Sequence, residues 1–197
     1  MKQLFIISLL LIASTHVITA ADAVAGKNKA AMCVACHGAD GNSFNPEWPS
    51  LAEQNASYLS KQITDFRSGN RKNAQMSPMA AALSDQDIVD IAAFFSSQKL
   101  KDGATKEQYL NLGSKIYSSG LPGIMACSGC HGPTGAGLEA AGFPHIAGQQ
   151  IQYVINQLNN FKNNSRTNDA TGMMKSIATA MNDEQIEAVA NYLSGLH

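Results

Sequence analysis

Two pentapeptides of the form Cys-x-x-Cys-His are the residues of this chain best suited to carry chemistry. The first is Cys33 to His37, and the second is Cys127 to His131. Two thiols and an adjacent imidazole at this spacing suit a zinc site, a disulfide, or covalent attachment of haem c. In haem attachment the two thiols bond the vinyl groups of the macrocycle, and the imidazole reaches its iron.

The setting of the two motifs favours haem. A structural zinc site needs four ligands supplied in pairs, whereas each motif here lies in its own half of the chain. A thioredoxin-like redox pair needs a βαβ pattern, which the sequence lacks. Disulfides would leave His37 and His131 unexplained. We therefore predict two haem c groups, with His37 and His131 on the irons. The thioether-forming residues are then Cys33, Cys36, Cys127 and Cys130.

Both motifs belong to an internal repeat that covers most of the chain. Downstream of each motif the same landmarks follow in the same order. The matched pairs are Pro49 with Pro144, Tyr58 with Tyr153, Phe66 with Phe161 and Ser84 with Asn182. A repeat of this kind predicts two homologous domains. We place domain 1 at residues 21–98, a polar Gly-containing linker at 99–108, and domain 2 at 109–197.

Each half is predicted to be helical, because its apolar residues recur at helical spacing. The stripe in the last helix of each half is Ile88, Ile91, Ala92 and Phe95, or Ile186, Val189, Ala190 and Leu193. Ser84 with Asp87, and Asn182 with Gln185, have the spacing of a capping box. The fold class is therefore all-α, with three or more helices in each domain. A domain with so few helices buries only a small core, and a haem packed among the helices would complete that core.

The second axial ligand of each iron is predicted to be a methionine. When the halves are aligned on their last helices, only Met76 and Met174 are methionine in both copies. Met173 is a close rival, because a one-residue shift in the loop would exchange it with Met174. A thioether ligand raises the reduction potential relative to two imidazoles. An iron with six protein and macrocycle ligands has no open position, which favours electron transfer over catalysis.

The N-terminus has the pattern of a secretory signal peptide at residues 1–20. Lys2 is followed by an apolar run from Leu4 to Ile12 and then by small residues up to Ala20. The run is too short to span a bilayer, which takes roughly 20 helical residues. We expect cleavage after Ala20 and a periplasmic mature protein.

Composition excludes several functional classes. The formal net charge is −1 and only 15% of residues are charged, so the basic excess of a nucleic-acid-binding protein is missing. The hydrophobic fraction of 45% also argues against intrinsic disorder. Because the one membrane-like apolar stretch is the N-terminal one, a polytopic membrane protein is excluded as well.

At these residues the chain resembles the class I cytochromes c, and residues 21–197 as a whole resemble the dihaem cytochrome c4 family. The resemblance rests on both Cys-x-x-Cys-His motifs, the Met76 and Met174 loops, and the closing segment Asn191 to His197. It implies two tandem all-α domains related by a pseudo-twofold axis. It also implies that Pro49 and Pro144 supply the backbone carbonyls that accept the ring N–H of the haem histidines.

The resemblance further implies a soluble or loosely membrane-associated periplasmic carrier, and not an enzyme. Its electrons would come from a quinol-oxidising complex and go to a terminal oxidase. The alternative is a dihaem electron-accepting subunit of a periplasmic dehydrogenase, such as a flavocytochrome c sulfide dehydrogenase. A dihaem peroxidase would need one displaceable axial ligand, which the symmetric Met76 and Met174 pattern disfavours.

Overall fold

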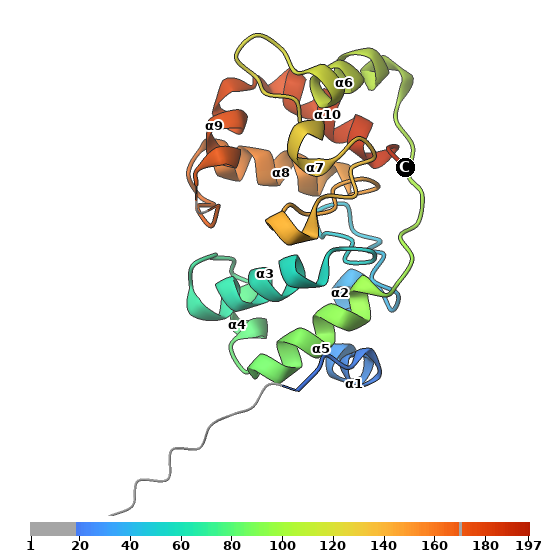
Figure 1. The fold of residues 1–197 in the computed structure, drawn as a ribbon, viewed down its shortest axis with the longest axis vertical. Coiled ribbons are helices and arrows are strands. Elements are labelled where there is room, and N and C mark those ends of the chain that lie inside the picture. Colours follow the sequence, from blue (N-terminus) through green and yellow to red (C-terminus); the bar gives the residue numbers. More distant parts are fainter. Residues whose placement is uncertain (1–18, 170) are drawn as a thin grey trace, which may run out of the picture.

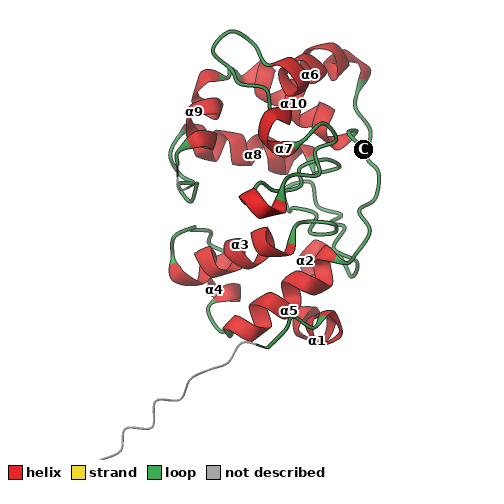
Figure 2. Ribbon diagram, viewed as in Figure 1, coloured by secondary structure: helices red, strands yellow, loops and turns green. Residues whose placement is uncertain are grey.

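The computed structural model describes residues 19–169 and 171–197, and this part of the chain is built from helices and loops (Figures 1 and 2). The first half contains α1 (Ala23–Lys29), η1 (Ala30–Met32), α2 (Val34–His37), α3 (Ala56–Ser68), α4 (Met76–Ala80) and α5 (Asp85–Ser96). The second half contains α6 (Glu107–Ser119), α7 (Ser128–His131), η2 (Glu139–Ala141), α8 (Ile151–Lys162), α9 (Met173–Ala180) and α10 (Asp183–Ser194). Strand-like pairing in the described residues is limited to two isolated bridges, Leu121 with Ile124 and Leu138 with Phe143. The all-α, two-domain prediction is therefore confirmed, while the expected signal peptide falls mostly on residues 1–18, outside the described part.

The last helix of each half begins with the predicted capping box. The Ser84 hydroxyl accepts a hydrogen bond from Asp87 N, and the Asp87 carboxylate accepts one from Ser84 N. Asn182 and Gln185 make the same reciprocal pair at the start of α10. Each box satisfies two of the backbone N–H groups that a helix start leaves unpaired.

The predicted apolar stripes are buried, and they form two separate cores. In the first half Leu59 of α3 packs with Ile91 and Phe95 of α5, and Phe66 of α3 is buried as well. In the second half the core takes in α6, α8, α9 and α10. Its buried members include Ile116, Tyr117, Val154, Leu158, Phe161, Ile186, Val189 and Leu193. Because each half buries its own stripe, neither depends on the other for its core.

A glycine allows the first and last helices of each half to cross closely. Gly26 of α1 lies against the backbone of Asp90 in α5, and Gly113 of α6 lies against Ala188 in α10. A β-carbon on Gly113 would stand 2.5 Å from the Ala188 carbonyl oxygen, closer than atoms tolerate. The two crossings are equivalent in the repeat, and each brings the helix preceding the motif onto the C-terminal helix.

A single extended segment joins the halves between Ser96, the end of α5, and Glu107, the start of α6 (Figure 1). Helix α6 starts inside the expected linker of 99–108, because an acidic residue in a first helical turn interacts favourably with the helix dipole. Within the described residues, no helix has both the length and the apolar character that crossing a membrane requires.

Candidate functional site

Each Cys-x-x-Cys-His motif folds as one tight helical turn. In the first motif Cys33 O accepts from Cys36 N at 3.1 Å and from His37 N at 2.9 Å. In the second, Cys127 O accepts from Cys130 N at 3.2 Å and from His131 N at 2.9 Å. Helices α2 and α7 therefore present two sulfurs and one imidazole from a single turn in each domain.

The described residues form neither a disulfide nor a cluster of metal-binding side chains at the motifs. All four cysteines are free thiols, so neither pair is joined as a disulfide. Among residues 19–169 and 171–197, no three His, Cys, Asp or Glu side chains gather as the ligands of a metal ion.

Both motif histidines are buried, and each is fixed by a proline carbonyl. His37 Nδ1 lies 2.9 Å from Pro49 O, and His131 Nδ1 lies 2.9 Å from Pro144 O. A carbonyl oxygen can only accept, so Nδ1 must carry the proton, and Nε2 keeps a free lone pair. Burial lowers the pKa of both histidines, which keeps each ring neutral and able to bind a metal.

Burial favours the protonated form of the first thiol in each motif. Burial raises the pKa of Cys33 above its ordinary value and that of Cys127 to about 11. When haem is bound, each cysteine of a motif would hold it through a thioether, the sulfur bonding one vinyl carbon and the thiol hydrogen going to the other.

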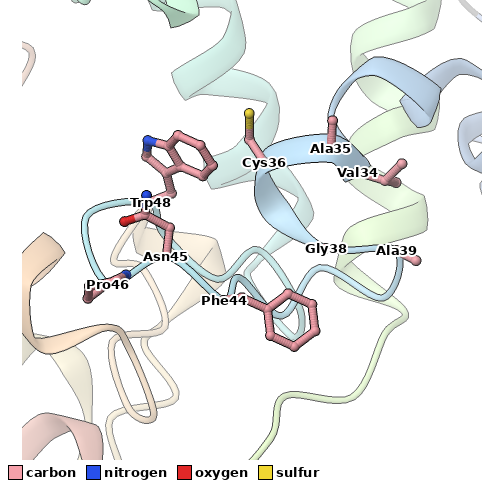
Figure 3. A pocket seen from close by; sticks show the side chains of 9 residues that line it. All are labelled: Val34, Ala35, Cys36, Gly38, Ala39, Phe44, Asn45, Pro46 and Trp48. Atoms are coloured by element: carbon pink, nitrogen blue, oxygen red, sulfur yellow. The ribbon is translucent and has the colours of Figure 1, made fainter.

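The first motif borders a hollow of about 540 Å³ (Figure 3). Figure 3 shows the Cys36 side chain and the Trp48 indole at this hollow, with the Phe44 ring at another side of it. The remaining lining residues are Val34, Ala35, Gly38, Ala39, Asn45 and Pro46. The lining is mainly apolar, and it includes Cys36 but not Cys33, His37 or Met76.

The predicted methionine ligands lie at equivalent places in the two halves. Met76 is the first residue of α4, and its backbone N–H is held by the Asn73 side chain at 2.8 Å. Met174 lies in the first turn of α9 and packs against the core of the second half. The rival Met173 places its sulfur 3.9 Å from Cys130 Sγ. Both candidates in the second half therefore stay close to the motif or its surrounding core.

These donor sets fit haem c. Each half offers two thiols, one imidazole Nε2 and at least one thioether, which are the groups that covalent attachment and His/Met axial ligation need. His145, one of the two described histidines outside the motifs, is engaged elsewhere. Its Nδ1 lies 3.0 Å from Glu53 O, across the boundary between the halves.

Sequence reasoning missed a pair of buried arginines at that boundary. Arg71 donates to Tyr153 OH at 3.2 Å, and Arg166 donates to Tyr58 OH at 2.9 Å, so each reaches into the opposite half. The exposed fractions of Arg71 and Arg166 are 9% and 7%. Their signal was available, because both follow the matched phenylalanines of the repeat at the same interval.

Each arginine also stacks on a phenylalanine ring of its own half. The Arg71 guanidinium lies 4.6 Å from the centre of the Phe66 ring, and that of Arg166 lies 4.5 Å from the Phe161 ring. Such a cation over an aromatic face is favourable, the more so when water is excluded. The boundary between the halves is therefore an ordered contact with a pseudo-twofold pattern.

Comparison with known proteins agrees with this geometry. The family model described as "Cytochrome c" matches the chain twice, over residues 23–99 and 111–197. Cytochrome c4 of Pseudomonas aeruginosa is 44% identical over 201 residues, covering 100% of both chains. A protein of Stutzerimonas stutzeri named "Thiosulfate dehydrogenase electron acceptor" is 40% identical, over 87% of this chain and 82% of its own. The crystal structure of reduced recombinant cytochrome c4 from Pseudomonas stutzeri matches with a TM-score of 0.88 at 43% identity, over 90% of this chain and 100% of that one.

Proposed function

Because the chain belongs to the cytochrome c family, we propose that it is a periplasmic carrier that passes electrons from a quinol-oxidising complex to a terminal oxidase. Membership of the family with two motifs means that the chain binds two haem c groups covalently and transfers electrons. The partners, the compartment and the individual ligands are our proposal. We assign thioether formation to Cys33, Cys36, Cys127 and Cys130, and axial ligation to His37, Met76, His131 and Met174.

The observation that carries this proposal is the matched histidine–proline contact in both halves. The bonds from His37 to Pro49 and from His131 to Pro144 have the same length, 2.9 Å. Each fixes the ring tautomer and its orientation before any electron moves, so little reorganisation is needed when charge changes. Two sites prepared alike suit two one-electron carriers better than one catalytic and one relay haem.

The chain's residues supply the remaining requirements of a carrier. The haem iron, when bound, provides the one-electron ferric/ferrous couple. Met76 and Met174 would supply soft sulfur to the two irons, which would favour the ferrous state and leave no position open to oxygen or peroxide. The ordered boundary between the halves, with its crossed Arg71 and Arg166 contacts, keeps the two sites at a constant separation.

An anaerobic potentiometric titration of the exported holoprotein tests the proposal. We expect two one-electron steps, together with the long-wavelength methionine-sulfur-to-ferric-iron absorption band from both haems. A high-spin haem with steady turnover of peroxide would contradict the carrier function, because it requires an open axial position.

A second candidate function is electron acceptance from a periplasmic dehydrogenase, with this chain as its dihaem partner or subunit. The similarity to a relative named as the electron acceptor of thiosulfate dehydrogenase favours it. Rapid mixing of the oxidised holoprotein with each donor in turn separates the two functions. The physiological donor is the one that reduces both haems at a rate that saturates with donor concentration.

A further inference from the structure

Two glutamine side chains cross the boundary between the halves, and each pairs with both backbone groups of one residue. Gln149 Oε1 accepts from Ser50 N at 2.8 Å, and Gln149 Nε2 donates to Ser50 O at 2.9 Å. In the opposite direction, Gln54 Oε1 accepts from His145 N at 2.9 Å, and Gln54 Nε2 donates to His145 O at 2.7 Å. The two pairs occupy equivalent positions of the repeat.

Each glutamine is hydrogen-bonded to the residue directly after the proline whose carbonyl binds the motif histidine. Pro49 C=O and Ser50 N–H belong to the same peptide group. The carbonyl of that group accepts from His37 Nδ1, and its N–H donates to Gln149 of the other half. A hydrogen-bonded path therefore runs from His37 through one peptide group to the second half.

The second half repeats the arrangement. The peptide group between Pro144 and His145 accepts from His131 Nδ1 and donates to Gln54 of the first half. Each motif histidine is thus linked through a single peptide group to a glutamine of the opposite half.

The orientation of both side-chain amides is fixed by their partners. Gln149 Oε1 also accepts from Gln150 N at 2.9 Å, and Gln54 Oε1 also accepts from Asn55 N at 3.0 Å. Because backbone N–H groups only donate, these atoms must be the amide oxygens. Gln54 and Gln149 are both buried, with exposed fractions of 7% and 9%, which limits competition from water.

A peptide group that donates through its N–H becomes a stronger acceptor at its carbonyl, since consecutive hydrogen bonds polarise one another, by roughly 10–30% per bond. A stronger acceptor draws the Nδ1 proton and makes the imidazole a more electron-rich ligand. We propose that Gln149 and Gln54 are positioning residues that tune the axial histidine of the opposite domain, Gln149 acting on His37 and Gln54 on His131. This inference rests on the proposed function, because it assumes that both histidines are iron ligands.

Replacing Gln149 in the holoprotein tests the inference. In Gln149→Leu the Ser50 N–H loses its acceptor, so the bond between His37 and Pro49 should weaken. We expect the Nδ1–H proton resonance of His37 in the reduced, diamagnetic protein to move upfield. The reduction potential of the first haem should rise, because a less electron-rich imidazole stabilises ferric iron less, while the second haem changes by a small fraction of that shift.

Gln149→Glu is a second variant that retains an oxygen in place of Oε1 and the shape of the side chain. The His37 resonance should then stay in place or move downfield, opposite to the leucine variant. Gln54→Leu is the mirror experiment and should move the resonance of His131 and the potential of the second haem. A residue that only holds the halves together would not separate the leucine variant from the glutamate variant in this way, and it would not produce this exchange of haems.

Gln150→Leu is the matched control. Its side chain also crosses the boundary, from Nε2 to Ser43 O at 2.6 Å, but that carbonyl does not belong to the peptide group bound by His37. It should leave the His37 resonance in place. Equal shifts of both haems in Gln149→Leu, or none, would overturn the inference while leaving the carrier function intact. A parent protein without two His/Met haems would instead overturn the proposed function.

Discussion

Arg71 and Arg166 share the same two acceptors. Gln62 Oε1 accepts from Arg71 at 2.7 Å and from Arg166 at 3.1 Å, and Gln157 Oε1 accepts from them at 2.8 and 3.0 Å. Two like charges are thereby bridged by a pair of neutral amide oxygens. The arrangement is symmetric, with one arginine and one glutamine from each half.

Removal of either guanidinium should weaken the boundary. Arg71→Met loses charge-assisted hydrogen bonds to Gln62, Gln157 and Tyr153, and partial relief of like-charge repulsion offsets part of that loss. We expect the free energy of unfolding of the holoprotein to fall by about 2 kcal/mol, measured by urea titration. Arg166→Met should cost a similar amount, and the double variant less than the sum, because the two residues share acceptors.

Lys101→Ala is the control for those variants. Lys101 pairs with Asp40 at 2.9 Å, and both side chains are largely open to solvent. Exposed pairs contribute about 0–1 kcal/mol. If Lys101→Ala lowered the free energy of unfolding as much as Arg71→Met does, the buried network would contribute no more to stability than an exposed ion pair.

Met76→Leu should remove the long-wavelength band of the first haem and lower its potential. The reason is that leucine cannot donate sulfur to the iron, and thioether ligation is what raises the potential. Met79→Leu, three residues further along in the same helix, should leave both unchanged. Optical titration of the two variants side by side is the measurement. Loss of the band in Met79→Leu alone would move the assignment to Met79.

The second domain offers two adjacent candidates. The repeat predicts that Met174→Leu removes the second haem's band and that Met173→Leu preserves it. The contact of Met173 with Cys130 makes the comparison informative, because Met173 is also near the motif. The opposite pattern in the ferric spectra would assign the ligand to Met173.

Acid should destabilise the first domain through a carboxylate cluster that the second lacks. Lys29 Nζ lies 2.8 Å from Asp87 and 2.7 Å from Asp90. The ion pair with Lys29 lowers the pKa of Asp87 to about 2, and it also lowers the pKa of Asp90. A depressed folded-state pKa gives stability that is complete above the unfolded value of about 3.9 and is lost as pH falls toward 2.

We therefore expect unfolding of the first domain to become easier between about pH 4 and pH 2, measured by its haem absorbance in acid titrations. Asp87→Asn should reduce this acid dependence. Asp183→Asn is the control in the second domain, because Asp183 is almost fully exposed and its contact with Lys162 is long, at 3.4 Å. An equal reduction in both variants would contradict the assignment.

Gly113→Ala should destabilise the second domain, although glycine to alanine in a helix normally gains about 1 kcal/mol. The added β-carbon would meet Ala188 O at 2.5 Å and Tyr192 Cβ at 2.6 Å, so α6 and α10 must move apart. Overpacking of this kind costs about 1–3 kcal/mol in denaturant titrations. Gly129→Ala in α7, whose β-carbon meets no atom within 4 Å, should not destabilise the domain. A stabilised Gly113→Ala would show that the helices have room to separate.

Much of the fold was predictable because its signals are local. The stripe from Ile88 to Phe95 and the pairing of Ser84 with Asp87 depend on residues within one helix, and the structure confirms both. The second half repeats the same stripe and the same capping pair, which strengthened each prediction. The place of Pro49 was available only through a family resemblance, because nothing in its own neighbourhood identifies the partner of its carbonyl.

The boundary between the halves was not predictable in the same way. Gln54, Gln149, Arg71 and Arg166 look like ordinary polar residues of loops and helix ends. These residues are buried because the two halves meet at the faces that carry them. The periodicity of residues within one helix does not indicate which faces of the halves meet. The one available sign was that Gln54 and Gln149, like Arg71 and Arg166, occupy equivalent positions of the two halves. Polar residues are expected at equivalent positions when each contacts the other half of the repeat.

The extended segment between Ser96 and Glu107 changes how strong this boundary has to be. Each half buries its own core, and the contacts between them described above are hydrogen bonds of polar side chains. Two separate molecules joined by such contacts would dissociate readily at cellular dilution. A covalent tether holds each half at a high effective concentration around the other, so contacts of modest individual strength suffice to keep the halves together. Association is therefore independent of how much protein the cell makes.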